Sequence, residues 1–164
     1  MSDAAVTYTS YLKVDELLSL QVPRSDGPEH DELLFIVVHQ VYELWFKQVL
    51  WELDHVVDLL DADDQVRAGQ TLRRVLAILK VMVAQMDVLE TMTPLEFLSF
   101  RARLDSASGF QSVQFRELEM VLGLKDPGAV ERAAVNGDAR PRLAARLRAP
   151  SLWDAFRSHL ARRE

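Results

Sequence analysis

The sequence predicts an all-α fold, a helical bundle with two long antiparallel helices and several shorter helices. Two segments without glycine or proline, residues 29–68 and 70–93, are the first indication, because both residue types interrupt helices. Apolar residues recur in these segments at intervals of three and four positions, as they do on the buried face of a helix. No alternating pattern typical of strands stands out. The length of 164 residues favours a single domain over 1–164.

The two long helices should pack together along their apolar faces, over residues 29–60 and 70–91. The connection is expected around Asp61-Ala62-Asp63-Asp64, where acidic residues replace the apolar pattern. The residues that define the two faces are Leu34, Val38, Val41, Trp45, Val49, Leu53, Val56 and Leu60 in the first helix, and Leu72, Val75, Leu79, Met82, Met86 and Leu89 in the second.

Shorter helices follow, and two of them have recognisable starts. Thr93-Pro94-Leu95-Glu96 has a capping threonine, a proline at the first helical position and a glutamate at the third. Ser151-Leu152-Trp153-Asp154 is a similar start, with an acid three residues after the serine. Each pattern predicts a helix that begins there and continues toward the C-terminus.

Glycine and proline indicate where these shorter elements stop. Gly123 is expected to end a helix over Ser112–Leu122. Lys125-Asp126-Pro127-Gly128 and Asn136-Gly137-Asp138 are expected to be turns.

Composition excludes some classes of protein. There is no cysteine, so disulfides and thiolate metal sites are absent. Hydrophobic residues make up 49% and charged residues 27%, which is typical of a globular protein. We expect a cytoplasmic location and no membrane partner, because no run of about 18 uncharged apolar residues occurs. The net charge of −6 argues against nucleic acid. Residues 1–64 carry a net charge of −11 and residues 65–164 one of +5; this gradient fits two differently solvated surfaces, and it could also favour head-to-tail contact between copies.

One histidine lies in a position of chemical interest. His39 occurs deep in an apolar helical segment, and Phe35, Tyr42 and Phe46 share its face of the predicted helix. Taken alone, this spacing fits either a core histidine with satisfied hydrogen bonds or a group that exchanges a proton or binds metal. Glu43 follows four residues later, but one His/Glu pair falls short of a metal site with three ligands.

Two further segments could belong to a site or could be ordinary structure. Arg101 lies on the helix that Thr93-Pro94 opens, with Arg103 nearby. The segment Ser106-Ala107-Ser108-Gly109-Phe110-Gln111-Ser112 has small residues that allow a flat ligand to approach the backbone, but it also fits a plain connection between helices.

Five segments of this sequence together resemble the tryptophan 2,3-dioxygenase family, in order and in spacing. The longest, from His30 to Gln48, reads HDELLFIVVHQVYELWFKQ. The others are Tyr8-Thr9-Ser10-Tyr11-Leu12-Lys13-Val14-Asp15, Thr93-Pro94-Leu95-Glu96-Phe97 through Phe100-Arg101, Ser108-Gly109-Phe110-Gln111-Ser112-Val113-Gln114-Phe115-Arg116, and Pro150-Ser151-Leu152-Trp153-Asp154-Ala155-Phe156. The resemblance runs from about Tyr8 to the C-terminus.

The resemblance implies an all-α, haem-dependent and typically tetrameric enzyme. Such an enzyme uses haem b and O₂ to open the indole ring of L-tryptophan to N-formylkynurenine. By position, His39 resembles the histidine that hydrogen-bonds the indole N–H, Phe35 resembles a wall of the indole pocket, and Arg101 resembles the arginine that pairs with the substrate carboxylate. The resemblance also implies that Ser108 and Gly109 lie against the haem, and that Tyr8 and Tyr11 close the pocket of a neighbouring subunit.

Two departures from the family pattern change these expectations. Met86 stands where an aromatic residue near the haem is expected, and the more flexible methionine would alter the edge of the pocket. The resemblance places the haem-ligating histidine, and a threonine that contacts the substrate ammonium, in a helical region beyond Glu164. His159 matches a helix that does not ligate haem, so we do not expect it to replace that ligand.

Three hypotheses remain open at this point. The chain could be part of a tryptophan dioxygenase that acts with a complementary C-terminal half or as a homo-oligomer. It could instead belong to a related haem-dependent oxygenase that acts on another indole or a phenol. It could also be a helical binding module without catalysis.

Overall fold

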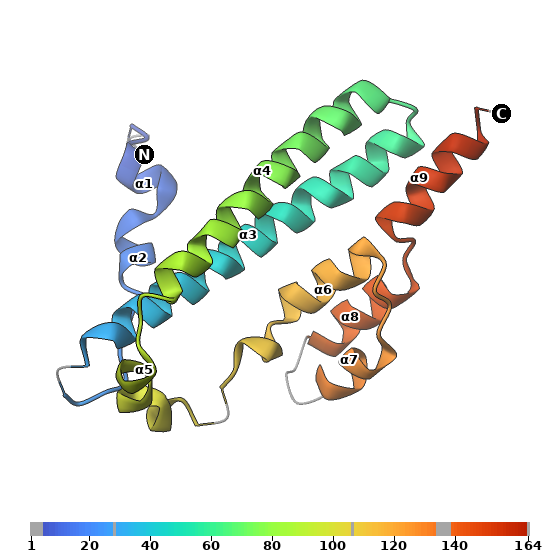
Figure 1. The fold of residues 1–164 in the computed structure, drawn as a ribbon. Coiled ribbons are helices and arrows are strands. Elements are labelled where there is room, and N and C mark those ends of the chain that lie inside the picture. Colours follow the sequence, from blue (N-terminus) through green and yellow to red (C-terminus); the bar gives the residue numbers. More distant parts are fainter. Residues whose placement is uncertain (1–4, 28, 106, 134–138, 164) are drawn as a thin grey trace.

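The computed structural model describes residues 5–27, 29–105, 107–133 and 139–163, and Figure 1 shows that this part of the chain is built from helices. The α-helices are α1 (Tyr8–Leu12), α2 (Val14–Leu18), α3 (His30–Asp61), α4 (Gln65–Leu89), α5 (Pro94–Arg101), α6 (Val113–Leu122), α7 (Pro127–Arg132), α8 (Ala139–Arg148) and α9 (Leu152–Ala161). Two 3₁₀ turns, η1 (Ala102–Leu104) and η2 (Gly109–Gln111), lie between α5 and α6.

Helices α3 and α4 form the predicted antiparallel pair and run side by side over most of the length of α3 (Figure 1). The turn falls at the expected acidic segment. Asp63 adopts a positive φ of 61°, and the Asp64 side chain accepts a hydrogen bond from the Arg67 amide at 3.1 Å. Capping of this kind satisfies an amide at the start of the helix that has no partner within the helix.

The core lies where α6 and α9 pack on α3 beside α4. It is made of aliphatic and aromatic side chains spaced by turns of the long helices. Its buried members include Phe46, Val49, Leu50 and Leu53 from α3, Val75, Ile78 and Met82 from α4, and Leu118 and Val121 from α6. Helix α8 packs against α6, and α7 packs against α8, around Met120, Ala129 and Leu143.

Helix α3 is long and apolar enough to cross a membrane by length and composition alone, and 22% of its most apolar 18-residue window is buried in the described part of the chain. It contains an 18-residue window with a mean hydropathy of about 1.2. A core helix of a globular protein meets the same criterion, and α3 contacts α4, α6 and α9.

The sequence predicted turns at residues 125–128 and 136–138. Residues 125–128 are not a simple turn, because Asp126 caps α7: its side chain accepts a hydrogen bond from the Gly128 amide at 2.8 Å, and Pro127 is the first helical residue. A proline after an acid therefore begins a helix here. The turn expected at Asn136-Gly137-Asp138 lies outside the described residues.

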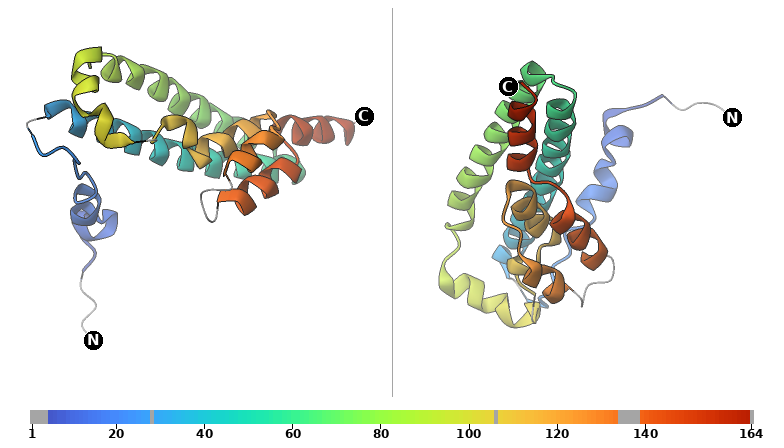
Figure 2. Two further views of the ribbon diagram at one scale, coloured as in Figure 1. Left: turned by 90° about the horizontal axis from the view of Figure 1, so that it is seen from below. Right: turned by 90° about the vertical axis from the view of Figure 1, so that its right-hand side faces the viewer.

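The N-terminal arm, which comprises α1 and α2, stands apart from the bundle (Figures 1 and 2). Neither helix contains a buried residue. At the same end of the molecule, α5 folds across α3 after the end of α4. This end carries most of the site residues that are predicted from the sequence.

Candidate functional site

A shallow groove lies between the N-terminal part of α3 and the segment that joins α4 to α5. Its volume is about 420 Å³. The lining is mostly apolar and comes from both sides: Phe35 and His39 from α3, Leu89 from α4, and Met92, Thr93, Pro94 and Phe97 from the connection and α5. An apolar groove of this size with two polar side chains, His39 and Thr93, suits a flat aromatic ligand.

Three phenylalanine rings hold α5 against α3. The Phe35 ring centroid lies 5.8 Å from that of Phe97 and 5.6 Å from that of Phe100, and Phe97 and Phe100 meet edge to face at 5.5 Å. Phe100 is completely buried. The threonine and glutamate of the predicted capping box fix the start of α5, since Thr93 and Glu96 each cap the other's backbone amide. One wall of the groove is therefore aromatic and rigidly placed.

His39 faces this wall, with its ring centroid 4.1 Å from that of Phe35. Its Nδ1 lies 2.7 Å from the Phe35 carbonyl oxygen, one helical turn earlier. A carbonyl oxygen can only accept a hydrogen bond, so Nδ1 must carry the proton and donate it. In the neutral imidazole, Nε2 is then an acceptor. His39 thus presents a hydrogen-bond acceptor beside an aromatic wall.

Gly109 approaches the same nitrogen from another part of the chain. A Cβ placed on Gly109 would lie 3.9 Å from His39 Nε2, which is ordinary van der Waals distance. Ser108 and Gly109 are both exposed, and Ser108 donates its backbone N–H to Gln111 Oε1 at 3.4 Å. The fold therefore brings the His39 segment and the Ser108–Gly109 segment together, although 70 positions separate them.

Arg101 is the last residue of α5, directly after the buried Phe100. Its guanidinium donates from Nη1 to the Asp105 carbonyl oxygen at 3.0 Å. The side chain is half-buried. The aromatic contacts of α5 with Phe35 therefore also determine where Arg101 lies.

The remaining predicted site residues are more exposed. Met86 is 42% exposed on α4, one turn before Leu89 of the groove. Tyr8 and Tyr11 are 77% and 75% exposed on α1, and the arm places them away from α5 (Figure 1). Within this chain, the structure does not bring the two tyrosines to His39.

Polar contacts that the sequence did not reveal hold α4 to α3 behind the groove. Gln85 Nε2 donates to the Val38 carbonyl oxygen at 3.0 Å, and the Tyr42 hydroxyl donates to the Met82 carbonyl oxygen at 2.7 Å. Burial raises the pKa of Tyr42 above its ordinary value, so this phenol keeps its proton. No sequence signal pointed to Gln85, because its partner is a backbone group on another helix.

Comparison with known proteins identifies the relationships of the chain. Residues 1–162 match the family model described as tryptophan 2,3-dioxygenase. The chain belongs to the tryptophan 2,3-dioxygenase family.

Individual members of this family are closely similar in sequence. The tryptophan 2,3-dioxygenase of Herpetosiphon aurantiacus is 63% identical over 156 residues, which are 95% of this chain and 60% of the relative. The enzymes of Anaeromyxobacter sp. (strain K) and Caulobacter vibrioides are 56% and 46% identical, over 96% of this chain and 59% of each relative. The chain therefore spans about 60% of the length of these curated tryptophan 2,3-dioxygenases.

Haem, the cofactor of tryptophan 2,3-dioxygenases, can be tested against the residues present. The exposed Ser108–Gly109 segment beside His39 Nε2 has no bulky side chain, and it fits the edge of a flat macrocycle. Among the described residues, no group of three or more His, Asp and Glu side chains could hold a metal ion. The described residues thus leave room for a flat group beside His39 and supply no cluster of metal ligands.

His159 lies at the opposite end of α3 from this site. It is buried, and its Nδ1 lies 3.2 Å from both the Leu60 carbonyl oxygen and Asp63 Oδ1. Leu60 follows His39 by 21 positions on one straight helix, which is roughly 30 Å. His159 therefore ties α9 to the α3–α4 turn and cannot share a ligand with His39.

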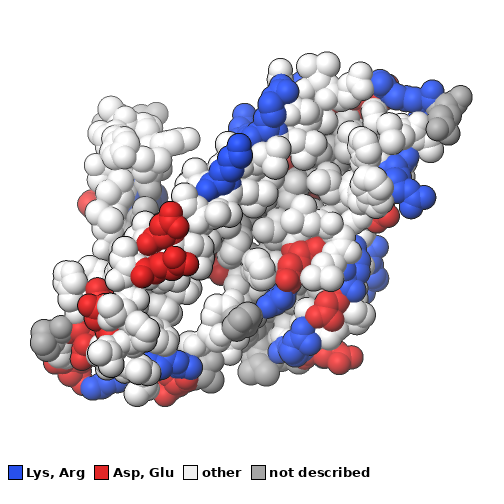
Figure 3. All heavy atoms as spheres, viewed as in Figure 1, with Lys and Arg blue, Asp and Glu red and all other residues white. Residues whose placement is uncertain are grey.

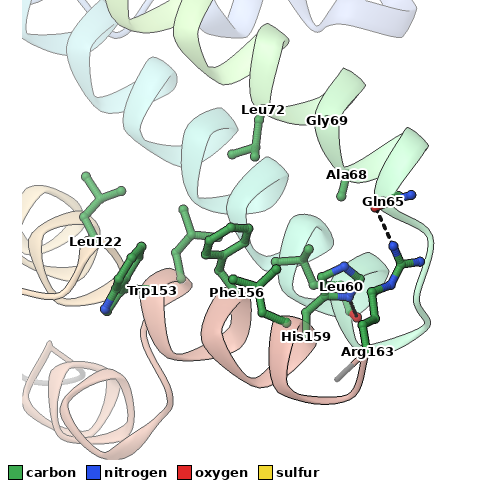
Figure 4. Close-up of a pocket in the computed structure, with 12 residues that line it drawn as sticks. Leu60, Gln65, Ala68, Gly69, Leu72, Leu122, Trp153, Phe156, His159 and Arg163 are labelled. Atoms are coloured by element: carbon green, nitrogen blue, oxygen red, sulfur yellow. Dashed lines mark hydrogen bonds between the residues drawn. The ribbon is translucent and has the colours of Figure 1, made fainter.

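A second groove, of about 460 Å³, surrounds His159 between α4 and α9 (Figure 4). Leu72, Trp153, Phe156 and Leu160 make it apolar, and Arg163 lies at its end, where it donates to Gln65 at 2.8 Å. This groove is larger than the one at His39, but its only charged group, Arg163, is already paired with Asp63 at 3.0 Å. It has aromatic rings of its own, Trp153 and Phe156, with centroids 5.7 Å apart, but its histidine is buried, whereas His39 is only half-buried.

Proposed function

We propose that this chain forms the indole pocket of a haem-dependent tryptophan 2,3-dioxygenase that opens the ring of L-tryptophan to N-formylkynurenine. The observation that carries the proposal is the 2.7 Å contact between His39 Nδ1 and the Phe35 carbonyl oxygen. Because Nδ1 donates to the Phe35 carbonyl, Nε2 is free to accept from the substrate's indole N–H. An indole ring would lie in the groove against Phe35 and Phe97.

The other residues have roles that fit their chemistry. Arg101 would hold the substrate carboxylate, since a guanidinium binds carboxylate through two parallel hydrogen bonds and stays charged when desolvated. Ser108 and Gly109 would lie against the haem, with Met86 near its edge. Haem supplies the activation of O₂ when it is bound, and the protein supplies orientation and exclusion of water.

We further propose that the arm acts on a second copy. The apolar side chains of α1 and α2, among them Tyr8, Tyr11 and Leu18, are exposed, and the described part of the chain does not bury them. Closing the pocket of a neighbouring subunit in a homotetramer would cover them. This function implies a cytoplasmic location and a role in tryptophan catabolism.

The direct test is a chimera in which this chain replaces the matching part of the Herpetosiphon aurantiacus enzyme, at 63% identity. Given L-tryptophan and ¹⁸O₂, the chimera should yield N-formylkynurenine with two labelled oxygens, as detected by mass spectrometry. Incorporation of a single oxygen would favour a related haem-dependent oxygenase. A folded, haem-loaded chimera without product would favour a binding module.

A further inference from the structure

A buried acid marks the point where the N-terminal arm joins the bundle. Glu32, in the first turn of α3, is only 1% exposed. Its Oε1 accepts from the Arg24 amide at 2.6 Å, and its Oε2 accepts from the Ser25 amide at 3.0 Å and the Ser25 hydroxyl at 2.5 Å. A buried carboxylate is costly unless such donors satisfy it, so this one is fully committed to residues 24 and 25.

The charge of Glu32 is stabilised where it lies. Burial by itself would raise its pKa, but hydrogen bonds from Arg24 and Ser25, together with the nearby Arg103 guanidinium, outweigh burial and lower it. The position in the first turn of α3 also favours a negative charge, because the amides of a helix N-terminus point toward it. Glu32 is therefore ionised at neutral pH, when its three contacts are strongest.

Few other contacts hold the arm in place. Gln21 and Gln40 pair through their side chains, and Gln40 Nε2 donates to the Leu20 carbonyl oxygen at 3.1 Å. Asp26 pairs with Arg103 at 3.2 Å, but both side chains are exposed, and exposed ion pairs contribute little. Since α1 and α2 bury no residue, the direction of the arm depends on these polar contacts near the start of α3.

We propose that Glu32 is a positioning residue whose buried carboxylate fixes residues 24 and 25 and so sets the direction in which the arm leaves the bundle. The consequence for catalysis rests on the proposed function, in which the arm closes the pocket of a second copy. Glu32 itself does not contact substrate. It acts through the arm.

The first experiment uses the 164-residue chain and limited trypsin digestion. Glu32→Gln keeps the size of the side chain but replaces one acceptor oxygen with an NH₂ group that faces backbone donors. Cleavage after Arg24 should become at least about tenfold faster, while cleavage after Lys80 in α4 stays within about twofold. Asp31→Asn is the matched control, because it removes the same charge from the same helical turn without touching residues 24 and 25. An unchanged rate after Arg24 in Glu32→Gln would refute the proposal.

A second measurement stays decisive if Glu32→Gln does not fold. In the wild-type chain, the amide signals of Arg24 and Ser25 are followed by NMR from pH 7 to pH 3. Both should shift together with one midpoint below the ordinary glutamate pKa of about 4.3, since protonation removes their acceptor. The contacts are thus present above that midpoint and are lost as pH falls through it. Amides that do not titrate, or that titrate with unrelated midpoints, would overturn the assignment.

The catalytic consequence is measured separately in the chimera. Glu32→Gln should raise KM for tryptophan at least about fivefold and leave kcat within about twofold, because the chemistry at His39 is unaltered. A chimera that makes no product would count against the proposed function, and it would leave the digestion and NMR results unaffected. Unchanged KM with the expected digestion result would refute only the role of the arm in closing the pocket.

Discussion

At the scale of single residues, one contact gives His39 its chemical character. A histidine in an apolar helix could simply be a satisfied core residue, and the spacing of the sequence left both interpretations open. The 2.7 Å contact of Nδ1 with the Phe35 carbonyl uses one nitrogen as a donor and leaves the other as an acceptor toward the groove. The Nδ1 contact therefore fixes the orientation of the imidazole, and Nε2 remains able to accept a hydrogen bond from a ligand.

Arg101 provides the residue-scale prediction. In the chimera, Arg101→Ala should remove about 2–4 kcal/mol of transition-state stabilisation. This corresponds to a fall in kcat/KM for tryptophan of roughly 30- to 1000-fold. Arg101→Lys should also be clearly impaired, because lysine keeps the charge but not the paired hydrogen bonds. Tryptamine, which lacks the carboxylate, should be affected far less by either change.

Arg103→Ala is the matched control for Arg101, since this neighbouring arginine pairs with the exposed Asp26. It should leave the preference for tryptophan over tryptamine unchanged. If Arg101→Ala also left that preference unchanged, the carboxylate role would be wrong, and Arg101 would be an arginine that only caps the Asp105 carbonyl.

The sequence predicted part of this site and missed the rest for physical reasons. Phe35 and His39 lie four positions apart on one helix, so helical geometry alone placed them together, and their rings do meet. The contact of Phe97 with Phe35 and the approach of Gly109 to His39 depend on tertiary packing, which no local sequence pattern encodes. The functional roles of all these residues, and of Tyr8, Tyr11, Ser108 and Met86, stay predictions.

At the scale of elements, helix caps were the most predictable feature. The capping boxes at Thr93 and Ser151 and the stop at Gly123, where φ is 115°, are present as expected. Residues 125–128 were misread as a turn, because proline and glycine suggest a break, whereas Asp126 places them at a helix start. The short helices of the arm have too little periodicity to be delimited from the sequence.

Two capping boxes in different surroundings give the element-scale prediction. Ser151 is buried and caps α9, which packs on α3, whereas Thr7 is exposed and caps α1. Ser151→Ala should lower the free energy of unfolding by about 1 kcal/mol. Thr7→Ala should leave the main thermal transition unchanged, since α1 contributes no buried residue. Equal losses of thermal stability in both variants would mean that the arm is part of the cooperative unit.

At the scale of the whole molecule, charge and apolar surface are unevenly distributed. Figure 3 shows basic side chains along α4 toward its start and acidic ones toward its end. The basic residues of α4 are Arg67, Arg73, Arg74 and Lys80, and Asp87 and Glu90 lie at the acidic end. Helix α4 also exposes Leu76 and Val83, at 57% and 72%, and α3 separately exposes Trp51 at 74%. Large apolar side chains that stand in solvent are candidates for contact with another copy of the chain.

We therefore predict that the 164-residue chain self-associates in solution. Sedimentation should show concentration-dependent oligomers, and a dye specific for apolar surface should bind. Replacing Leu76 and Val83 by glutamine should weaken association while leaving the circular dichroism of the helices intact, because both side chains are exposed. A monomer that binds no dye at any concentration would show that the exposed apolar side chains of α3 and α4 do not form an interface.

The central claim is that His39 Nε2 accepts the indole N–H of tryptophan. It is tested most directly by kcat/KM for tryptophan and 1-methyltryptophan in the chimera and in its His39→Ala variant. A methyl group on the indole nitrogen removes the donor, so the wild-type chimera should prefer tryptophan strongly. His39→Ala should reduce that preference by roughly tenfold, the value of one hydrogen bond of about 1–1.5 kcal/mol. The same preference in both proteins would show that His39 does not bind the indole nitrogen.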